Sequence, residues 1–322
     1  MNLKGKTILV TGGAGFIGAH AAKRFIELGA KVVIVDNFNA FYDVDFKKDR
    51  LNALLKKNTY KLYKVDIGDF KKLEKVFKEN KINLICHQAA QAIVRHPHAD
   101  PFTYEHSNIR GTLNIFELAR LHKIKTVVFA SSSSVYGDSP KSPFKEVDPT
   151  DLPASLYAAT KKSDELLAHA YHHVYGLHIT GLRYFNVIGP WCRPDLAPYK
   201  FLKLVMNGKE IQMYNYGKMT RDFVHVNDVV DGIVKAFQKN LPFDAINIGY
   251  GKPVPVPQIV TIIEKETGIK ARIKLMPLPK EDVVDSYSNV SYAHKILGWK
   301  PRVKFEDAMK ELISWYKEYH QL

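Results

Sequence analysis

The chain has 322 residues, of which 46% are hydrophobic and 25% charged, and its formal net charge is +14. A chain this long and this apolar can bury a substantial core, so a disordered protein is excluded. No apolar run reaches the roughly 18 residues of a membrane-spanning helix, which excludes an integral membrane protein. Lysines concentrate at residues 45–81. We interpret this stretch as a solvated face, with attraction of a small anionic substrate as the alternative, and expect no nucleic-acid partner because no arginine-rich recognition motif accompanies it.

The cysteines and the N-terminal residues indicate the cellular compartment. The two cysteines are Cys86 and Cys192, and Cys86 ends an apolar run typical of a buried strand, so we expect both thiols to be reduced. Residues 1–6 lead directly into a strand-like run, without the apolar region of a signal peptide. We therefore expect a cytoplasmic protein.

The first half of the chain alternates short apolar runs with amphipathic stretches. The runs are rich in β-branched residues, which is typical of parallel strands covered on both faces, and lie at residues 6–11, 31–36, 60–65, 82–86, 126–130 and 178–183. Between them we predict helices at residues 16–28, 69–80, 101–122 and 154–175. This alternation predicts an α/β fold of the Rossmann type, a doubly wound parallel sheet with ligands at the carboxyl ends of its strands.

After Tyr184 the pattern changes, because prolines cluster and the strands become short. We predict a cofactor-binding domain at residues 1–184 and a smaller mixed α/β substrate-binding lobe at residues 185–322. A helix predicted at residues 227–239 is expected to return to the first domain within a segment spanning 223–250.

A glycine-rich turn follows the first strand and opens the first helix. Its glycines permit a tight turn and let backbone N–H groups approach a pyrophosphate at the helix N-terminus. Asp36 ends the second strand, where a carboxylate binds ribose hydroxyl groups and repels a 2′-phosphate, so the sequence predicts an NAD site. The expected cofactor contacts are Gly12, Gly15, Phe16, Ile17, Gly18, Asp36, Asn37, Asp66 and Ile67. For Asp66, an ordinary turn residue is an equally good interpretation.

Tyr157 and Lys161 lie four residues apart in a predicted helix and so share one face. A lysine ammonium beside a phenol favours the phenolate, which can act as a base. A run of serines at residues 131–134 ends the fifth strand, where a hydroxyl can share a substrate proton with the tyrosine. A Tyr–Lys pair also arises by chance, so the hypothesis depends on its combination with the glycine turn.

Together these motifs resemble the extended short-chain dehydrogenases/reductases of the NAD-dependent sugar epimerase/dehydratase family over nearly the whole chain. The resemblance implies that Ser132, Tyr157 and Lys161 are catalytic and that Tyr157 and Lys161 also contact NAD. It implies a first step in which the tyrosinate takes a proton from a sugar hydroxyl while hydride moves from the same carbon to NAD. Ser133 and Ser134 stand where dehydratases and decarboxylases of the family carry a carboxylate, which favours epimerisation.

Three segments resemble UDP-glucuronate 4-epimerases, at residues 36–43, 189–197 and 215–223. The resemblance implies a UDP-sugar substrate, with Arg193 at the sugar carboxylate and Arg221 at the diphosphate. From the residues alone, Arg193 could instead cap local carbonyls, and Arg221 could form an ion pair with Asp222. The expected substrate contacts are Arg95, Ser132, Ser133, Ser134, Asn186, Arg193 and Arg221.

Two departures from the subfamily pattern leave the sugar open. The segment Arg183-Tyr184-Phe185-Asn186 also occurs in neutral-sugar epimerases, and Lys280 is only a tentative substitute for a second basic nucleotide contact. The alternatives are a UDP-glucose/UDP-galactose 4-epimerase, then a nucleotide-sugar decarboxylase or reductase, and finally a non-catalytic NAD-binding protein.

We expect no metal site, because no set of ligands converges in the sequence and the family chemistry uses none. Similar enzymes form homodimers. The helices predicted at residues 101–122 and 154–175 are therefore expected either to pair across a two-fold axis or to be buried within one chain.

Overall fold

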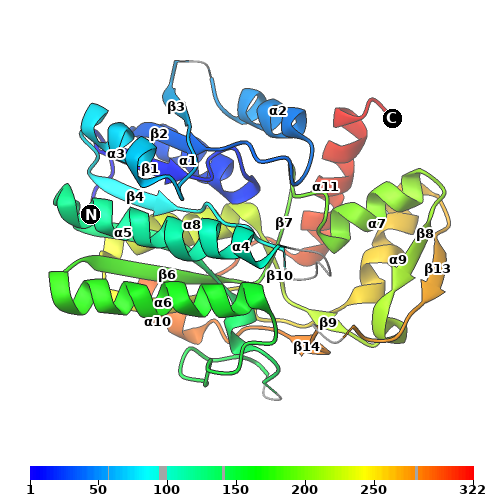
Figure 1. The fold of residues 1–322 in the computed structure, drawn as a ribbon. Coiled ribbons are helices and arrows are strands. Elements are labelled where there is room, and N and C mark those ends of the chain that lie inside the picture. The colour runs from blue at the N-terminus through cyan, green and yellow to red at the C-terminus, as the bar shows by residue number, and fades with distance from the viewer. Residues whose placement is uncertain (57, 94–99, 140–141, 280–281) are drawn as a thin grey trace.

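The computed structural model describes residues 1–322 except 57, 94–99, 140–141 and 280–281 (Figure 1). Its centre is a parallel sheet made of β1 (Thr7–Thr11), β2 (Lys31–Asp36), β3 (Tyr60–Lys64), β4 (Leu84–His87), β5 (Thr126–Ser132), β6 (His178–Tyr184) and β11 (Phe243–Ile248). The seven strands are ordered β11-β6-β5-β4-β1-β2-β3. The order reverses between β1 and β4, which confirms the predicted doubly wound Rossmann-type sheet.

Helices cover both faces of the sheet, because successive side chains of each strand point to opposite faces. The face that carries Val10 and Ile34 packs against α1 (Phe16–Glu27) and α8 (Val226–Lys239). The opposite face, with Leu9 and Val33, packs against α3 (Phe70–Glu79), α5 (Gly111–Leu121) and α6 (Leu156–Tyr175), which lie in front of the sheet in Figure 1. Both cysteines are buried and free, as predicted.

The predicted helix at residues 101–122 is divided into three parts. It consists of α4 (Pro101–Tyr104), a π-helical segment η1 (Glu105–Arg110) and α5. The wider turn holds Asn108, which is buried and donates a hydrogen bond from Nδ2 to Thr160 Oγ1 of α6 at 2.9 Å. A π-helical turn of this kind is common near functional sites.

The catalytic pair predicted from the sequence lies on α6, whose ends follow standard capping rules. Ser155 accepts a hydrogen bond from the N–H of Ala158 at 3.2 Å, which begins the helix, and Gly176 ends it in the left-handed conformation. Tyr157 and Lys161 are therefore on one side of the first turns of a long helix.

One prediction about local structure is wrong, and one helix is missing from the predictions. The strand β3 is at the edge of the sheet and Lys61, Leu62 and Lys64 are exposed, so it is not covered on both faces. A helix, α2 (Val44–Leu54), was not predicted because its charged residues weaken the apolar pattern. Its signals are the N-cap Asp43 and three buried positions, 46, 50 and 51, at helical spacing.

The second half of the chain builds small sheets beside the main one (Figure 1). Its strands are β7 (Asn186–Ile188), β8 (Glu210–Met213), β9 (Thr220–Arg221), β10 (Phe223–His225), β12 (Val254–Pro255), β13 (Arg272–Leu275) and β14 (Asp285–Ser286), and its helices are α7 (Ala197–Met206), α9 (Val256–Thr267), α10 (Ser291–Leu297) and α11 (Phe305–Tyr319). The chain returns to the first half through α8, which packs on α1, and β11, which pairs with β6. Within the described ranges, no helix has both the length and the apolar character needed to cross a bilayer.

Candidate active site

A cavity of about 360 Å³ opens at the carboxyl ends of the sheet strands. It is lined by residues of both halves of the chain, which is where the fold class predicts a ligand. All but one of the predicted site residues line it, namely Gly12, Gly15, Phe16, Ile17, Gly18, Asp36, Asn37, Asp66, Ile67, Ser132, Ser133, Ser134, Tyr157, Lys161, Asn186, Arg193 and Arg221. The exception, Arg95, lies outside the described residues, as does Lys280.

The glycine turn leaves the space that a dinucleotide would need. Gly12 has a φ of +64°, and a Cβ there would lie 2.7 Å from the backbone of Ala89. A Cβ at Gly18 would lie 2.2 Å from the carbonyl oxygen of Gly12, so side chains are excluded from this turn. The N-terminus of α1 has no side-chain cap, so its first N–H groups can bind an anion. These residues fit the diphosphate of NAD.

Asp36 organises the backbone around the glycine turn. Its Oδ2 accepts a hydrogen bond from the N–H of Ala14 at 3.0 Å, and its Oδ1 accepts one from the N–H of Phe38 at 2.8 Å. Lys47 of α2, which the sequence analysis missed, also lines the cavity and donates to Asn39 O at 2.7 Å. Burial lowers the pKa of Lys47, and the charge of Asp36 offsets only part of this effect.

Asp66 makes the contacts of a turn residue while lining the cavity. It accepts hydrogen bonds from the N–H of Gly68 and from Asn37 Nδ2, both at 2.8 Å, and from His106 Nε2 at 3.1 Å. Burial by itself raises the pKa of Asp66, but the hydrogen bonds from Asn37 and Gly68 and the charge of His106 outweigh it, so the pKa is lowered. The carboxylate therefore holds Asn37 at the end of β2.

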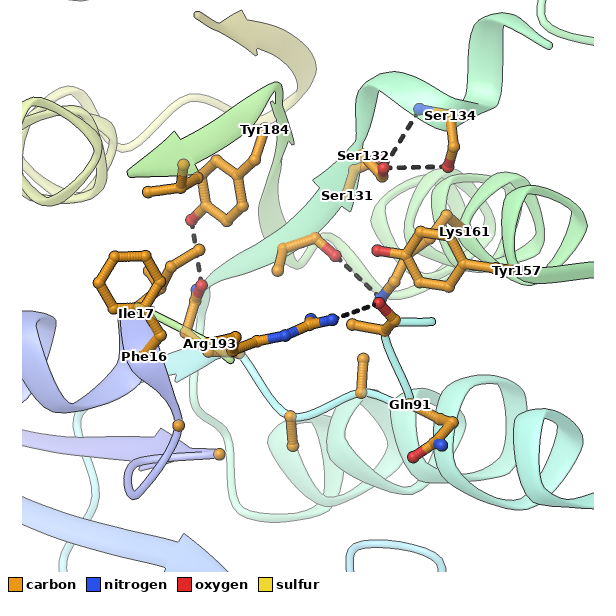
Figure 2. A pocket seen from close by; sticks show the side chains of 18 of the residues that line it. Phe16, Ile17, Gln91, Ser131, Ser132, Ser134, Tyr157, Lys161, Tyr184 and Arg193 are labelled. Atoms are coloured by element: carbon orange, nitrogen blue, oxygen red, sulfur yellow. Dashed lines mark hydrogen bonds between the residues drawn. The ribbon is translucent and has the colours of Figure 1, made fainter. Parts of the chain in front are cut away.

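Tyr157, Lys161 and Ser132 face the same cavity from α6 and from the end of β5 (Figure 2). Ser132 Oγ lies 2.9 Å from Ser134 Oγ and accepts the N–H of Ser134 at 3.1 Å. Lys161 Nζ donates to the carbonyl oxygen of Ala130, also in β5, at 3.0 Å. This bond ties the lysine of α6 to the strand that carries the serine.

A carboxylate missed by the sequence analysis lies beneath Lys161. Asp164 Oδ2 is 3.0 Å from Lys161 Nζ, and both side chains are almost completely buried. Burial lowers the pKa of Lys161, but Asp164 and Tyr157 outweigh this effect and raise it, so the ammonium form is favoured. Burial also raises the pKa of Asp164 to about 6, against the opposing charge of Lys161.

Arg193 reaches across the cavity toward Tyr157 (Figure 2). Its Nη2 donates to the carbonyl oxygen of Ala92 at 2.9 Å, and its guanidinium pairs with both carboxylate oxygens of Asp195, at 3.0 Å and 2.5 Å. Burial lowers the pKa of Arg193, whereas Asp195 and, more weakly, Tyr157 raise it, and the net effect is an increase. The carbonyl that Arg193 contacts is therefore not a local one, as the alternative interpretation expected, but belongs to a loop 101 residues away that also lines the cavity.

The alternative prediction, an ion pair between Arg221 and Asp222, is wrong. Asp222 is fully buried and turns its carboxylate to the N–H groups of Gly251 and Ser288, each at 3.0 Å. Arg221 pairs instead with Asp282, at 2.7 Å from Nη2 to Oδ1, 61 residues away in the chain. Asn186 Nδ2 donates to the carbonyl oxygen of Asp222 at 3.2 Å, so it borders the cavity beside Arg221.

The model of the NAD dependent epimerase/dehydratase family matches residues 8–249. The chain belongs to this family, and its cofactor is NAD.

Individual relatives are similar over nearly their whole length. The chain is 41% identical over 316 residues to a UDP-glucuronate 4-epimerase of Thermodesulfobacterium geofontis, covering 98% of this chain and 97% of that one. It is also similar to the crystal structure of a UDP-glucuronic acid 4-epimerase from Bacillus cereus with UDP-glucuronic acid and NAD, with a TM-score of 0.89, 29% identity and coverage of 97% and 99%. A crystal structure of a UDP-galactose 4-epimerase matches with a TM-score of 0.84, 30% identity and coverage of 97% and 99%.

Proposed function

We propose that this protein interconverts UDP-glucuronate and UDP-galacturonate by inverting C4 of the sugar through a 4-keto intermediate. At the level of enzyme class it is an NAD-dependent UDP-sugar 4-epimerase, like its relatives. The observation that carries the choice of a uronate is the placement of Arg193 in the same cavity as Tyr157 and Lys161.

The side chains of the cavity suit a reversible oxidation at a sugar carbon. Bound NAD supplies the acceptor, and later the donor, of the hydride. Tyr157 takes the proton of the C4 hydroxyl and returns it after the intermediate has turned, so each cycle consumes neither protons nor electrons. Lys161 stabilises the phenolate by its charge, which the raised pKa maintains. Ser132 donates a hydrogen bond to the C4 oxygen.

The residues beside Ser132 support epimerisation rather than elimination or decarboxylation. Ser133 and Ser134 line the cavity at positions where a general acid would serve those other reactions, and serine is too weak an acid for that purpose. The turning of the ketone also requires loose contacts with the sugar, while the nucleotide is held firmly. For the nucleotide, we propose that Arg221 and Asn186 contact the diphosphate.

Arg193 is suited to read a carboxylate because a guanidinium fork matches its geometry. In the structure Asp195 occupies this fork, so a sugar carboxylate would bind there by displacing Asp195. A neutral hexose is the second candidate. It is supported by the segment Arg183-Tyr184-Phe185-Asn186, a form that also occurs in neutral-sugar epimerases, and by the similarity to a UDP-galactose 4-epimerase.

The test is incubation of the purified protein with UDP-glucuronate, UDP-galacturonate, UDP-glucose and UDP-galactose, followed by NMR. Interconversion of the uronates without NADH or carbon dioxide is the expected result. Net cofactor consumption would indicate a reductase, carbon dioxide a decarboxylase, and turnover of the neutral sugars alone the second candidate.

In Tyr157→Phe, turnover should fall about 10³-fold or more while nucleotide affinity stays nearly unchanged, because only the base is lost. Wild-type turnover in this variant would overturn the assignment of the base.

The carboxylate role is tested by Arg193→Ala. Charge-assisted hydrogen bonds contribute about 1.5–3 kcal/mol each, so we expect kcat/KM for uronates to fall about 100-fold, and far less for UDP-galactose. The control is Arg193→Lys, which keeps the charge but not the fork and should fall between the two. Equal losses on both sugars would contradict this role.

We also propose a cytoplasmic homodimer in which α5 and α6 pair with the same helices of a second copy. These helices expose Leu113, Leu121 and Leu166, which are 38%, 47% and 60% exposed. Analytical ultracentrifugation tests this proposal. A monomer at micromolar concentration would contradict it, and Leu166→Glu should weaken the dimer, because a charge would then be buried in the interface.

A further inference from the structure

Arg50 is a buried guanidinium that contacts two separate loops of the active site. It comes from α2 and is 0% exposed. Its Nη1 donates to the carbonyl oxygen of Ala14 at 2.7 Å, in the glycine turn. Its Nε and Nη2 both donate to the carbonyl oxygen of Trp191, at 3.1 Å and 2.9 Å, two residues before Arg193. One rigid, planar group thus bridges backbone atoms 177 residues apart in the chain.

The positive charge of Arg50 is stabilised by the dipoles of its hydrogen-bond acceptors and by aromatic rings. Its other contacts are Tyr42 OH, 2.8 Å from Nη1, and the faces of the Phe46 and Tyr42 rings, 4.9 Å and 5.6 Å from Cζ. Within the described ranges, none of the ion pairs involves Arg50. Burying a charge without an opposite charge is costly, so a buried arginine of this kind needs several well-placed acceptors. The acceptors here are the carbonyl oxygens of the two loops together with the hydroxyl of Tyr42.

Both loops need this support. The peptide groups around Ala14 are held from two directions, because the N–H of Ala14 donates to Asp36 Oδ2 at 3.0 Å while its carbonyl accepts from Arg50. Trp191 has a φ of +63°, an unfavourable conformation for a bulky residue that persists only when its surroundings determine it. The paired donors of Arg50 on the Trp191 carbonyl fix the orientation of that peptide group, and with it the start of the segment that presents Arg193.

We propose that Arg50 is a positioning residue that couples the cofactor loop to the sugar-binding loop. A cofactor that orders the glycine turn fixes Ala14, and through Arg50 it fixes Trp191 and the placement of Arg193. NAD and the UDP-sugar then strengthen each other's binding, by the same factor in both directions. The identity of the group read by Arg193 as a uronate carboxylate rests on the proposed function, whereas the coupling of the two loops does not.

Calorimetric titration measures the factor by which NAD and the UDP-sugar strengthen each other's binding. UDP-glucuronate, UDP-galactose and UDP are titrated calorimetrically into nucleotide-stripped protein with and without saturating NAD, in a Tyr157→Phe background that prevents turnover. We expect NAD to tighten sugar-nucleotide binding about fivefold or more. In Arg50→Lys this coupling factor should fall to within about twofold of unity, because an ammonium lacks the planar set of donors that reaches the carbonyl oxygens of Ala14 and Trp191 together. The matched control is Arg24→Lys, on the exposed side of α1, which should keep the wild-type factor.

The outcomes separate the two proposals. If only UDP-galactose binds and reacts, the uronate assignment fails, while the coupling is still measured with UDP-galactose. If Arg50→Lys retains the wild-type factor, the coupling role is wrong. If Arg50→Lys does not fold, hydrogen exchange on the wild-type protein tests the coupling of the two loops instead. NAD alone should slow amide exchange at residues 189–196, and unchanged exchange there would overturn the proposal.

Discussion

Breaking the buried ion pair between Glu165 and Arg183 tests the packing beneath the active site. The side chains come from α6 and β6 and form a fork, with Nε to Oε1 at 2.8 Å and Nη2 to Oε2 at 2.9 Å. Each is only 6% exposed, and Glu165 Oε1 also accepts a hydrogen bond from Ser131 Oγ at 2.7 Å. Glu165→Gln keeps the shape of the side chain but removes its charge and turns one acceptor into a donor. We expect the variant to be strongly destabilised.

The magnitude follows from the burial of both partners. Removing one partner of a buried ion pair costs about 3–5 kcal/mol, because the other charge stays buried without compensation. Burial lowers the pKa of Arg183, but Glu165 outweighs this effect and raises it, so the loss of Glu165 removes the main stabilisation of the guanidinium. A domain is stable by only about 5–15 kcal/mol, and the change is therefore a large fraction of the total.

Urea unfolding at pH 7, followed by circular dichroism, measures the difference in unfolding free energy. The matched control is Glu74→Gln on α3, whose ion pair with Lys78 is partly exposed, and it should leave the midpoint nearly unchanged. The double variant Glu165→Leu with Arg183→Met should lose less than Glu165→Gln alone, because no unpaired charge remains. A loss below about 1 kcal/mol in Glu165→Gln, the range of an exposed pair, would refute this reasoning.

Two further predictions concern the glycine turn and the base of the active site. In Gly18→Ala the new Cβ would lie 2.2 Å from Gly12 O, and overpacking of about 1–3 kcal/mol should weaken NAD binding about 5- to 150-fold in a fluorescence titration; unchanged affinity would contradict the described turn. The pKa of Asp164 is about 6 in the folded state, above its usual 3.8, so the folded chain binds this proton more tightly than the unfolded chain. Its contribution to stability is fully present below the unfolded pKa and is lost as the pH rises through 6, so Asp164→Asn should reduce the fall in unfolding free energy between pH 4 and pH 7 by about 2 kcal/mol. An identical pH dependence in urea unfolding of both proteins would show that Asp164 does not titrate in this range.

The strands and the first helix are predictable because their signals lie within a few neighbouring residues. Residues 32–35 are apolar at successive positions, and the structure places β2 at Lys31–Asp36. The exposure of β3 is not predictable in this way, because whether a strand lies at the edge depends on the order of all strands. The helix α2 has a weak apolar periodicity, since two of its four buried positions are the charged residues Lys47 and Arg50.

The candidate site likewise contains features that short motifs predict and contacts that they do not. The residues of the Gly12–Gly18 turn, Asp36, Ser132 and the Tyr157–Lys161 pair belong to short motifs, so their proximity to one cavity follows from the fold class, while their individual roles stay predictions. Of the partners that set the charge state of the site, Asp282 comes from a distant segment and pairs with Arg221 across 61 residues. Asp164 lies three residues after Lys161 on α6, a spacing that a helix brings together, but only the packing of α6 buries the pair.

The amino-acid sequence by itself determined the alternation of strands and helices, the glycine turn that accepts a dinucleotide, and the family to which the chain belongs. Each depends on backbone conformation or side-chain periodicity over a few residues. Only the tertiary structure decided that Glu165 faces Arg183 and Asp282 faces Arg221, and that Arg50 joins the loops of Ala14 and Trp191. Hydrogen bonds and ion pairs act over about 3 Å, so such contacts depend on how distant segments pack, which no local pattern contains.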